Sequence, residues 1–341
     1  MAIRVGINGF GRIGRLFFRV LAKRPGDFEV VGINDLTEPA ALRHLLKYDT
    51  THGRFDGTVE VEGNNLVVNG VKIPVLSERD PSKLPWGKLE AEFAAECSGI
   101  FTNPAEGGKP GFDSHLAAGA KKVLISAPAS KGGVHTVVMG VNDKTLKPEH
   151  NLISNASCTT NCTAPIMKVI NEKFKIVRGM VTTVHGYTND QRILDGIHKD
   201  LRRARTAAGN IIPTSTGMSK AISEVLPELK GKIEGTAIRV PVSDGSLIDC
   251  TLVVEKNTTV DEVNATLKEY ANGALKGILE YTNDPIVSSD IVGNPHSSIA
   301  DGLGTMVQGG NLIKVISWYD NEWGFSNRMA DLLKHAKSVS K

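Results

Sequence analysis

The sequence predicts an α/β protein that is large enough for two domains. A chain of 341 residues exceeds the roughly 250–300 residues at which single hydrophobic cores stop growing. Near its start, a short apolar segment, a glycine-rich turn, an amphipathic segment and a second apolar segment follow one another, which is typical of a strand–helix–strand unit. Later segments, such as residues 236–242 and 246–256, alternate apolar and polar side chains and are predicted strands.

The composition is that of an ordinary globular enzyme and favours no special partner. Apolar residues make up 40% of the chain and charged residues 23%, and 40 basic side chains nearly balance 37 acidic ones. A net charge of +3 is too small to indicate binding to nucleic acid or to a membrane surface. The N-terminus shows no signal-peptide pattern, and no apolar run approaches the ~20 residues of a membrane span. We therefore expect a cytoplasmic protein that requires neither membrane nor nucleic acid.

The first 35 residues carry the pattern of a dinucleotide site. Residues 2–8 form a predicted buried strand. The spacing G-x-G-x-x-G follows at Gly9, Gly11 and Gly14, a helix is predicted to begin there, and a second predicted strand ends in a carboxylate at Asp35. Glycine-rich turns also join strands to helices where no cofactor binds, but this full context favours a cofactor site.

Each residue of this pattern has a physical reason. Gly9 allows the tight turn, Gly11 has no Cβ to block a pyrophosphate, and Gly14 lets helix and strand approach. The helix N-terminus then presents N–H groups and the positive end of its dipole to the phosphates. Asp35 is predicted to accept hydrogen bonds from the adenosine ribose hydroxyls and to repel a 2′-phosphate, which favours NAD over NADP.

The rest of the first half is predicted to extend the same sheet. Residues 92–101 and 122–129 are predicted buried strands, and residues 58–76 form a predicted antiparallel meander. Cys97 lies in the first of these segments, where a cysteine is more often a core residue than a reactive one. Ser126 lies where a strand ends, on the side at which open α/β sheets bind ligands.

Two cysteines, Cys158 and Cys162, lie four residues apart in the segment SNASCTTNCTAP (residues 154–165). A predicted strand ends just before Cys158 and a predicted helix begins at it, and N–H groups and the dipole at a helix start lower a cysteine pKa. A disulfide within one helical turn is disfavoured in a reducing compartment, and no further ligands for a metal lie nearby, so we predict no metal. Taken alone, Cys158 is as well explained by a structural role, because a nucleophile needs a partner base.

The best candidate for that base is His185. Residues 180–184 are a predicted strand, and His185 follows at its end. A single histidine is more often a surface group or a hydrogen-bonded core group. A cysteine at a helix start with a histidine at a strand end is, however, the arrangement of thiol catalysis. Next to a dinucleotide domain, it favours a covalent dehydrogenase over a protease.

Six motifs then resemble one family, in that family's order. They are INGFGRIGR, SNASCTTNCTAP, HGYTNDQ, KDLRRAR, IIPTSTG and SWYDNEWG, and together they resemble phosphorylating glyceraldehyde-3-phosphate dehydrogenase over essentially the whole chain. The resemblance implies oxidation of D-glyceraldehyde 3-phosphate to 1,3-bisphosphoglycerate in glycolysis or gluconeogenesis. It implies NAD as the cofactor, inorganic phosphate as the second substrate, and a homotetramer.

The resemblance also implies the reaction steps. Cys158 would attack the aldehyde carbon to give a thiohemiacetal, and His185 would take the hydroxyl proton as hydride leaves for NAD. Inorganic phosphate would then attack the resulting thioester. The backbone N–H of Cys158 suits the oxyanion, because it points out of a helix start.

Hydroxyl, backbone N–H and guanidinium groups are implied for the two anions, and the planar fork of arginine matches phosphate oxygens. The residues so implied are Ser157, Thr159, Thr188, Arg203, Thr216, Gly217 and Arg239. Arg202 is an alternative to its neighbour Arg203. The basic segment 199–205 also fits a solvated face or an RNA-binding patch, but the family context favours anion binding and subunit contacts.

For the cofactor, the resemblance adds residues to the glycine turn and Asp35. They are Arg12 and Ile13 at the pyrophosphate, Arg79 and Ser126 near the adenine and nicotinamide parts, and Asn321 at the carboxamide. Two positions depart from the family pattern. Phe325 stands where many members carry Tyr, and Gly196–Ile197 stand where NAD-using members often show Leu-Pro, which leaves the strictness of the NAD preference open.

The implied fold is a split Rossmann domain plus an α+β catalytic domain with a mainly antiparallel sheet. Residues 1–157 and 322–341 would form the NAD-binding domain, and residues 158–321 the catalytic domain. The apolar face of residues 324–339 fits a helix that returns to the first domain. Residues 190–213 show no periodicity, and the resemblance places this long segment in the core of the tetramer.

Two other functions stay open. Erythrose-4-phosphate dehydrogenase has the same fold without obligatory phosphate attack. Relatives of that kind tend to lose the Thr-Asn-Asp after the histidine and the Thr-Gly after IIP, and this chain keeps both, at residues 188–190 and 216–217. A catalytically silent binding protein of the same fold is disfavoured by the intact Cys158, His185 and Asp35.

Overall fold

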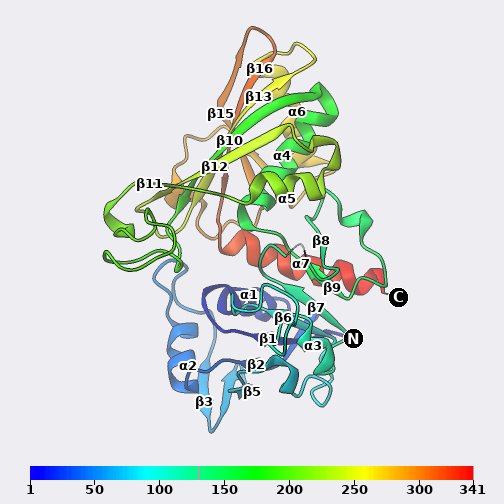
Figure 1. Cartoon of the computed structure of the whole chain (residues 1–341), viewed down its shortest axis with the longest axis vertical. Helices are drawn as coiled ribbons and strands as arrows, with labels where there is room; N and C mark the ends of the chain where they lie inside the picture. The colour runs from blue at the N-terminus through cyan, green and yellow to red at the C-terminus, as the bar shows by residue number, and fades with distance from the viewer. Residues whose placement is uncertain (130, 341) are drawn as a thin grey trace. The chain divides into compact units, whose positions relative to one another are not determined.

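The computed structural model describes residues 1–129 and 131–340, and these divide into two compact units. Unit 1 comprises Met1–Val137, Asp143–Ala156 and the residues from Ser326 on, and unit 2 comprises Val138–Asn142 and Ser157–Phe325. Each unit has its own β-sheet (Figure 1). The boundaries expected at residues 157 and 322 stay predictions.

Unit 1 contains a nine-stranded sheet in the order β3-β4-β5-β2-β1-β6-β7-β9-β8. Its strands are β1 (Ile3–Asn8), β2 (Phe28–Asn34), β3 (Val59–Glu62), β4 (Asn65–Val68), β5 (Val71–Leu76), β6 (Phe93–Glu96), β7 (Lys122–Ile125), β8 (His135–Thr136) and β9 (Leu152–Ser154). From β5 to β8 the neighbouring strands run parallel. The predicted meander is confirmed as β3, β4 and β5, and the structure adds the parallel pairing of β5 with β2.

The helices of unit 1 follow the predicted strand–helix–strand pattern. They are α1 (Arg12–Ala22), α2 (Pro39–Lys47), α3 (Ser114–Ala117) and most of α7 (Trp323–Val339), with 3-10 turns at Pro81–Lys83 and Asp143–Thr145. Helix α1 buries Leu16, Phe17 and Val20, as its spacing requires. The predicted C-terminal helix is present, and Arg24 donates hydrogen bonds to Asn327 and Asp331 on it.

Unit 2 contains a seven-stranded sheet in the order β11-β12-β10-β13-β16-β15-β14. Its strands are β10 (Ile176–Gly186), β11 (Ile212–Thr214), β12 (Ile233–Val240), β13 (Ser246–Val254), β14 (Leu279–Thr282), β15 (Ser298–Gln308) and β16 (Leu312–Tyr319). Four of the pairings are antiparallel and two are parallel. The predicted class, an α/β protein whose second sheet is mainly antiparallel, is confirmed.

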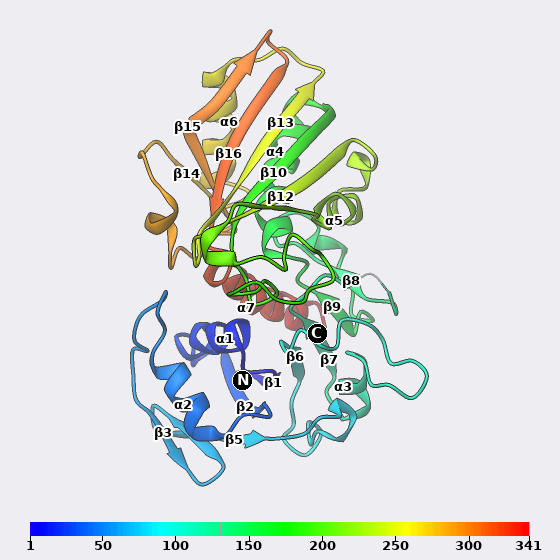
Figure 2. The same ribbon diagram turned by 60° about the vertical axis from the view of Figure 1, so that its left-hand side comes forward.

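Three helices cover one face of this second sheet (Figures 1 and 2). They are α4 (Cys158–Phe174), α5 (Met218–Val225) and α6 (Val260–Asn272), with 3-10 turns at Ala207–Gly209, Pro227–Leu229 and Ser288–Ile291. Between Gly186 and Ala207 the chain forms no helix or strand, whereas the end of the segment 190–213, which shows no periodicity, contains the turn Ala207–Gly209 and the start of β11. None of the helices that the structure describes is long and apolar enough to cross a membrane.

The strand order of unit 2 positions its polar residues. Strand β13 lies between β10 and β16, and Val184 pairs with Leu247 while Ser246 pairs with Tyr319. The end of β10, the start of β13 and the end of β16 therefore lie side by side, where these three central strands begin or end. On the other side of β10, His185 pairs with Arg239 of the parallel strand β12.

Candidate active site

Cys158 is the first residue of helix α4. Ser157 before it has extended backbone angles, and its Oγ accepts a hydrogen bond from the N–H of Thr160 (3.1 Å), which is the usual N-cap pattern. No acidic side chain lies in the first turn. The predicted helix start at Cys158 is confirmed, and the backbone N–H groups of Cys158 and Thr159 at that start act on the thiol.

His185 is the partner of this thiol. Its Nε2 lies 3.4 Å from Sγ of Cys158, within the range of a hydrogen bond to sulfur. The imidazole is 3% exposed, and its ring packs edge-on against Tyr319, with the ring centroids 5.8 Å apart. The structure thus brings together the two residues that the sequence proposes as nucleophile and base.

The protonation of this pair follows from burial and from one cation. Burial and the charge of Arg239 lower the pKa of His185 to about 3, so the imidazole is neutral at physiological pH and able to take a proton. Burial also raises the pKa of the Cys158 thiol, and the charge of Arg239 and the N–H of Thr159 lower it by less. The prediction that the pKa of Cys158 is lowered is therefore wrong for the chain without ligands, because desolvation raises this pKa by more than the N–H groups and dipole of the helix start lower it.

Arg239 lies on the far side of the imidazole. Its Nη1 is 2.7 Å from Nδ1 of His185 and donates to the carbonyl of Gly186 (3.0 Å). Its Nε is buried and has no hydrogen-bond partner among the residues that the structure describes. A buried guanidinium N–H without an acceptor is suited to an anion.

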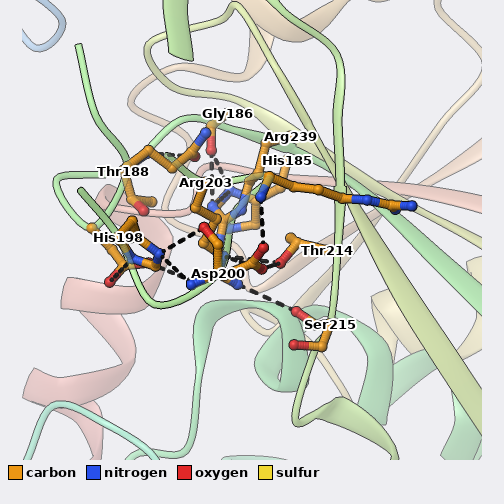
Figure 3. Close-up of polar contacts among 12 residues, drawn as sticks. His185, Gly186, Thr188, His198, Asp200, Arg203, Thr214, Ser215 and Arg239 are labelled. Atoms are coloured by element: carbon orange, nitrogen blue, oxygen red, sulfur yellow. Dashed lines mark hydrogen bonds and ion pairs between the residues drawn. The ribbon is translucent and has the colours of Figure 1, made fainter. Parts of the chain in front are cut away.

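Arg203 lies within a second polar cluster, on the irregular segment after β10 (Figure 3). Its Nε donates to Oγ1 of Thr214 (2.9 Å) and its Nη1 to Oδ2 of Asp190 (2.5 Å). Thr214 in turn donates to Asp200 (2.8 Å). Arg202 is exposed, whereas Arg203 is half-buried and held by these hydrogen bonds.

The other predicted anion ligands lie in or next to three elements: Thr159 is in α4, Thr216 and Gly217 precede α5, and Thr188 follows β10. Thr159 Oγ1 lies 3.0 Å from the hydroxyl of Tyr319. Thr216 Oγ1 accepts a hydrogen bond from the N–H of Met218 (3.3 Å), and Gly217 is the N-cap residue of α5. Thr188 donates its N–H to Gln191 (3.2 Å). These contacts fix the local geometry of each residue.

The glycine turn of unit 1 fits a dinucleotide. A Cβ on Gly9 (φ +88°) would lie 2.4 Å from the N of Ser98, and one on Gly14 would lie 2.1 Å from the O of Gly9. A Cβ on Gly11 would meet nothing within 4 Å, so this side of the turn is open where a pyrophosphate needs access. Helix α1 carries no acidic first-turn residue, so no carboxylate of its own first turn opposes an anion at the N–H of Ile13.

Three other predicted cofactor residues of unit 1 follow strands, and Arg12 is the first residue of α1. Asp35 follows β2 and accepts hydrogen bonds from the N–H groups of Phe10 (2.8 Å) and Thr37 (2.9 Å), one on each oxygen. Ser126 follows β7, and Arg79 is exposed after β5. The side chain of Arg12 pairs with Asp49 (2.6 Å).

Asn321, assigned to the carboxamide, is part of a hydrogen-bonded chain that the sequence did not predict. Ser246 donates to its Oδ1 (2.7 Å) and accepts from the N–H of Gly186 (3.1 Å). Tyr319, which contacts Thr159 and Thr183, was also missed. Ser246, Asn321 and Tyr319 are polar residues, and they lie near the ends of strands. The sequence does not show which of them contact one another, because the partners lie far apart in the sequence.

The other three cysteines are core residues. Cys97, Cys162 and Cys250 are buried, and burial raises the pKa of each thiol, for Cys162 to about 12. Cys97 lies one residue beyond β6, which ends at Glu96, rather than within the strand as expected.

Comparison with known proteins agrees with this arrangement. Residues 3–104 match the family model described as glyceraldehyde 3-phosphate dehydrogenase, NAD binding domain, and residues 157–321 match that of the C-terminal domain. Glyceraldehyde-3-phosphate dehydrogenase 1 of Bacillus subtilis is 59% identical over 333 residues, 97% of either chain. The enzymes of that name from Priestia megaterium and Geobacillus stearothermophilus are 58% and 57% identical, over 98% and 99% of either chain.

Proposed function

The chain belongs to the glyceraldehyde-3-phosphate dehydrogenase family, and we propose that it oxidises D-glyceraldehyde 3-phosphate with NAD and inorganic phosphate to 1,3-bisphosphoglycerate and NADH. The observation that carries this proposal is the distance of 3.4 Å between Sγ of Cys158 and Nε2 of His185. A nucleophilic thiol in contact with a neutral base is the requirement for a covalent thioester route.

Cys158 forms the covalent intermediates. Its sulfur bonds to the aldehyde carbon, and the thiol proton passes to the carbonyl oxygen, which gives a thiohemiacetal. The N–H groups at the start of α4 stabilise negative charge on that oxygen as the bond forms. Because burial raises the pKa of the free thiol, His185 takes this proton from the sulfur and passes it to the carbonyl oxygen, which leaves the imidazole neutral again.

His185 then removes the hydroxyl proton of the thiohemiacetal while the carbon loses a hydride and becomes a thioester. NAD, when bound, supplies the hydride acceptor. The imidazole can take this proton because burial and the charge of Arg239 keep it neutral at physiological pH. With the proton on Nδ1, which lies 2.7 Å from the carbonyl of Gly186, the lone pair of Nε2 faces the reacting atoms.

Two arginines and several N–H and hydroxyl groups hold the anions. We assign Arg239 and Thr188 to the phosphate of the substrate, supported by the unpaired Nε of Arg239. The inorganic phosphate is assigned to the two helix starts, with Arg203 held nearby by Asp190. The residues at those starts are Ser157 and Thr159 at α4 and Thr216 and Gly217 at α5. An oxygen of this phosphate attacks the thioester carbon, and the Cys158 thiolate leaves.

The cofactor is assigned to the glycine turn and to Asn321. The open side of Gly11 and the N–H groups at the start of α1 suit the pyrophosphate, and Asp35 suits the adenosine ribose. Gly14 and Gly9 shape the turn. Arg12, Ile13, Arg79 and Ser126 complete the assignment.

We further propose a cytoplasmic homotetramer. Residues 187–211 carry apolar side chains that are more than two thirds exposed in the single chain, and such side chains favour a subunit interface. They are Ile193, Leu194, Ile197, Leu201 and Ile211.

A comparison of two aldehydes tests the substrate. We expect kcat/KM for glyceraldehyde 3-phosphate to exceed that for erythrose 4-phosphate by about a hundredfold or more, since one further carbon and hydroxyl shift the reacting carbon from the anion site. A higher kcat/KM for erythrose 4-phosphate would overturn the assignment. The same measurement with NADP in place of NAD decides whether Gly196 and Ile197 relax the cofactor preference.

A further inference from the structure

Ser246 connects the strand that carries the base to the amide assigned to the nicotinamide. It is the first residue of β13, the strand between β10 and β16. Its Oγ accepts from the N–H of Gly186 (3.1 Å) and donates to Oδ1 of Asn321 (2.7 Å). Ser246 is 1% and Asn321 6% exposed, so water competes little for these bonds.

These bonds fix the orientation of the Asn321 amide. A backbone N–H only donates, so the hydroxyl oxygen is the acceptor toward Gly186 and its proton is available for Asn321. With Oδ1 toward Ser246, the N–H of Gly186, the hydroxyl of Ser246 and Oδ1 of Asn321 each have a partner. If the amide were rotated by half a turn, its NH2 would meet the hydroxyl, and the hydroxyl proton would lose the acceptor that it has here.

The position of Ser246 is itself fixed by close backbone packing. Gly245 has φ +89°, and a Cβ there would lie 2.4 Å from the O of Ser288. A Cβ on Gly186 would lie 2.8 Å from the O of Val242. The hydroxyl is therefore held at one place between the ends of β10 and β16.

On the basis of the proposed function, we propose that Ser246 is a positioning residue that turns the NH2 of Asn321 toward the cofactor. The amide then donates to the carbonyl oxygen of the nicotinamide carboxamide. The site therefore recognises the carbonyl oxygen of a C3-acyl pyridinium, and Asn321 makes no hydrogen bond to the amino group of the carboxamide. The same hydroxyl accepts the hydrogen bond from the N–H of Gly186, so it also contacts the backbone next to His185.

Calorimetric titration of three ligands tests the inference. The ligands are NAD, its 3-acetylpyridine analogue, which keeps the carbonyl but lacks the amino group, and ADP-ribose, which lacks the pyridine ring. We expect the wild-type enzyme to bind NAD and the acetylpyridine analogue within about threefold of each other. In Ser246→Ala, both Kd values should rise by about three- to tenfold, and the Kd of ADP-ribose should stay unchanged.

Ser246→Thr keeps the hydroxyl and should restore tight NAD binding. An unchanged Kd for NAD in Ser246→Ala, or equal losses for NAD and ADP-ribose, would overturn the positioning role. A loss of about tenfold or more for the acetylpyridine analogue in the wild-type enzyme would overturn the carbonyl recognition without any mutation. Failure of the wild-type enzyme to bind NAD at all would instead contradict the proposed function.

Discussion

The Nη1 atom of Arg239 lies 2.7 Å from Nδ1 of His185. Because a guanidinium only donates, this contact is a hydrogen bond only in the tautomer that carries the imidazole proton on Nε2, toward Sγ of Cys158. The carbonyl of Gly186 also lies 2.7 Å from Nδ1 and competes for it as a proton acceptor. Engagement of Arg239 by the substrate phosphate therefore favours the tautomer in which Nε2 is the base.

Arg239→Gln should raise the pKa of the Cys158 thiol. The positive charge of Arg239 lowers that pKa, against the larger opposing effect of burial, and the amide has no charge. The pH dependence of the alkylation rate of Cys158 by iodoacetamide should shift to higher pH, and KM for glyceraldehyde 3-phosphate should rise by about tenfold or more. Arg205→Gln, on the exposed pair of Arg205 with Asp195, is the matched control. An unshifted alkylation profile would show that Arg239 does not act on the thiol.

His185 should make the protein less stable in acid. Its pKa is about 3 when folded, against 6.5 as the ordinary value. Between these values the unfolded chain binds a proton that the folded chain does not, so the free energy of unfolding falls as pH falls through this window, by up to about 1.4 kcal/mol per pH unit. Above pH 6.5 the effect is absent. Urea unfolding should show a shallower loss in His185→Gln, and equal slopes in both proteins would contradict the low pKa.

Gly11→Ala and Gly14→Ala should separate cofactor binding from folding. An added Cβ at Gly11 meets nothing within 4 Å, whereas one at Gly14 lies 2.1 Å from the O of Gly9. Gly14→Ala should therefore destabilise the chain by about 1–3 kcal/mol. Gly11→Ala should change the free energy of unfolding by less than about 0.5 kcal/mol and still weaken NAD binding, because its methyl group occupies the path of the pyrophosphate. Unaltered NAD affinity in Gly11→Ala would place the pyrophosphate elsewhere.

Asp190→Asn should weaken the anion site at Arg203. The carboxylate of Asp190 lies 2.5 Å from Nη1 of Arg203 and orients that guanidinium. We expect KM for inorganic phosphate to rise by about three- to tenfold, since a neutral amide holds the arginine less firmly. Asp195→Asn, on the same segment but paired with the exposed Arg205, should leave it nearly unchanged. Equal effects of the two substitutions would indicate a general loosening of the segment.

Local patterns in the sequence predict the cofactor turn and the nucleophile. The reasons for Gly9 and Gly14 lie within a few residues or in the strand beside them, and Ser157 caps its own helix. The low pKa expected for Cys158 followed from the same local reasoning and was wrong, because burial depends on the whole fold around the thiol.

Pairings between strands that are distant in the chain could not be predicted from the sequence. The contact of Arg239 with His185 requires the register of β10 and β12, and that of Ser246 with Asn321 requires β13 to lie between β10 and β16. A shift of one residue in either register would turn these side chains to the opposite face. No periodicity within a single strand specifies that choice.

The most direct test of the thioester route is rapid-mixing measurement of NADH formed from glyceraldehyde 3-phosphate and NAD, with and without inorganic phosphate. We predict sustained turnover with phosphate. Without it, a burst of about one NADH per subunit should form and then stop, because the Cys158 thioester accumulates. Cys158→Ser should give neither. Equal sustained rates with and without phosphate, or turnover by Cys158→Ser, would contradict the account.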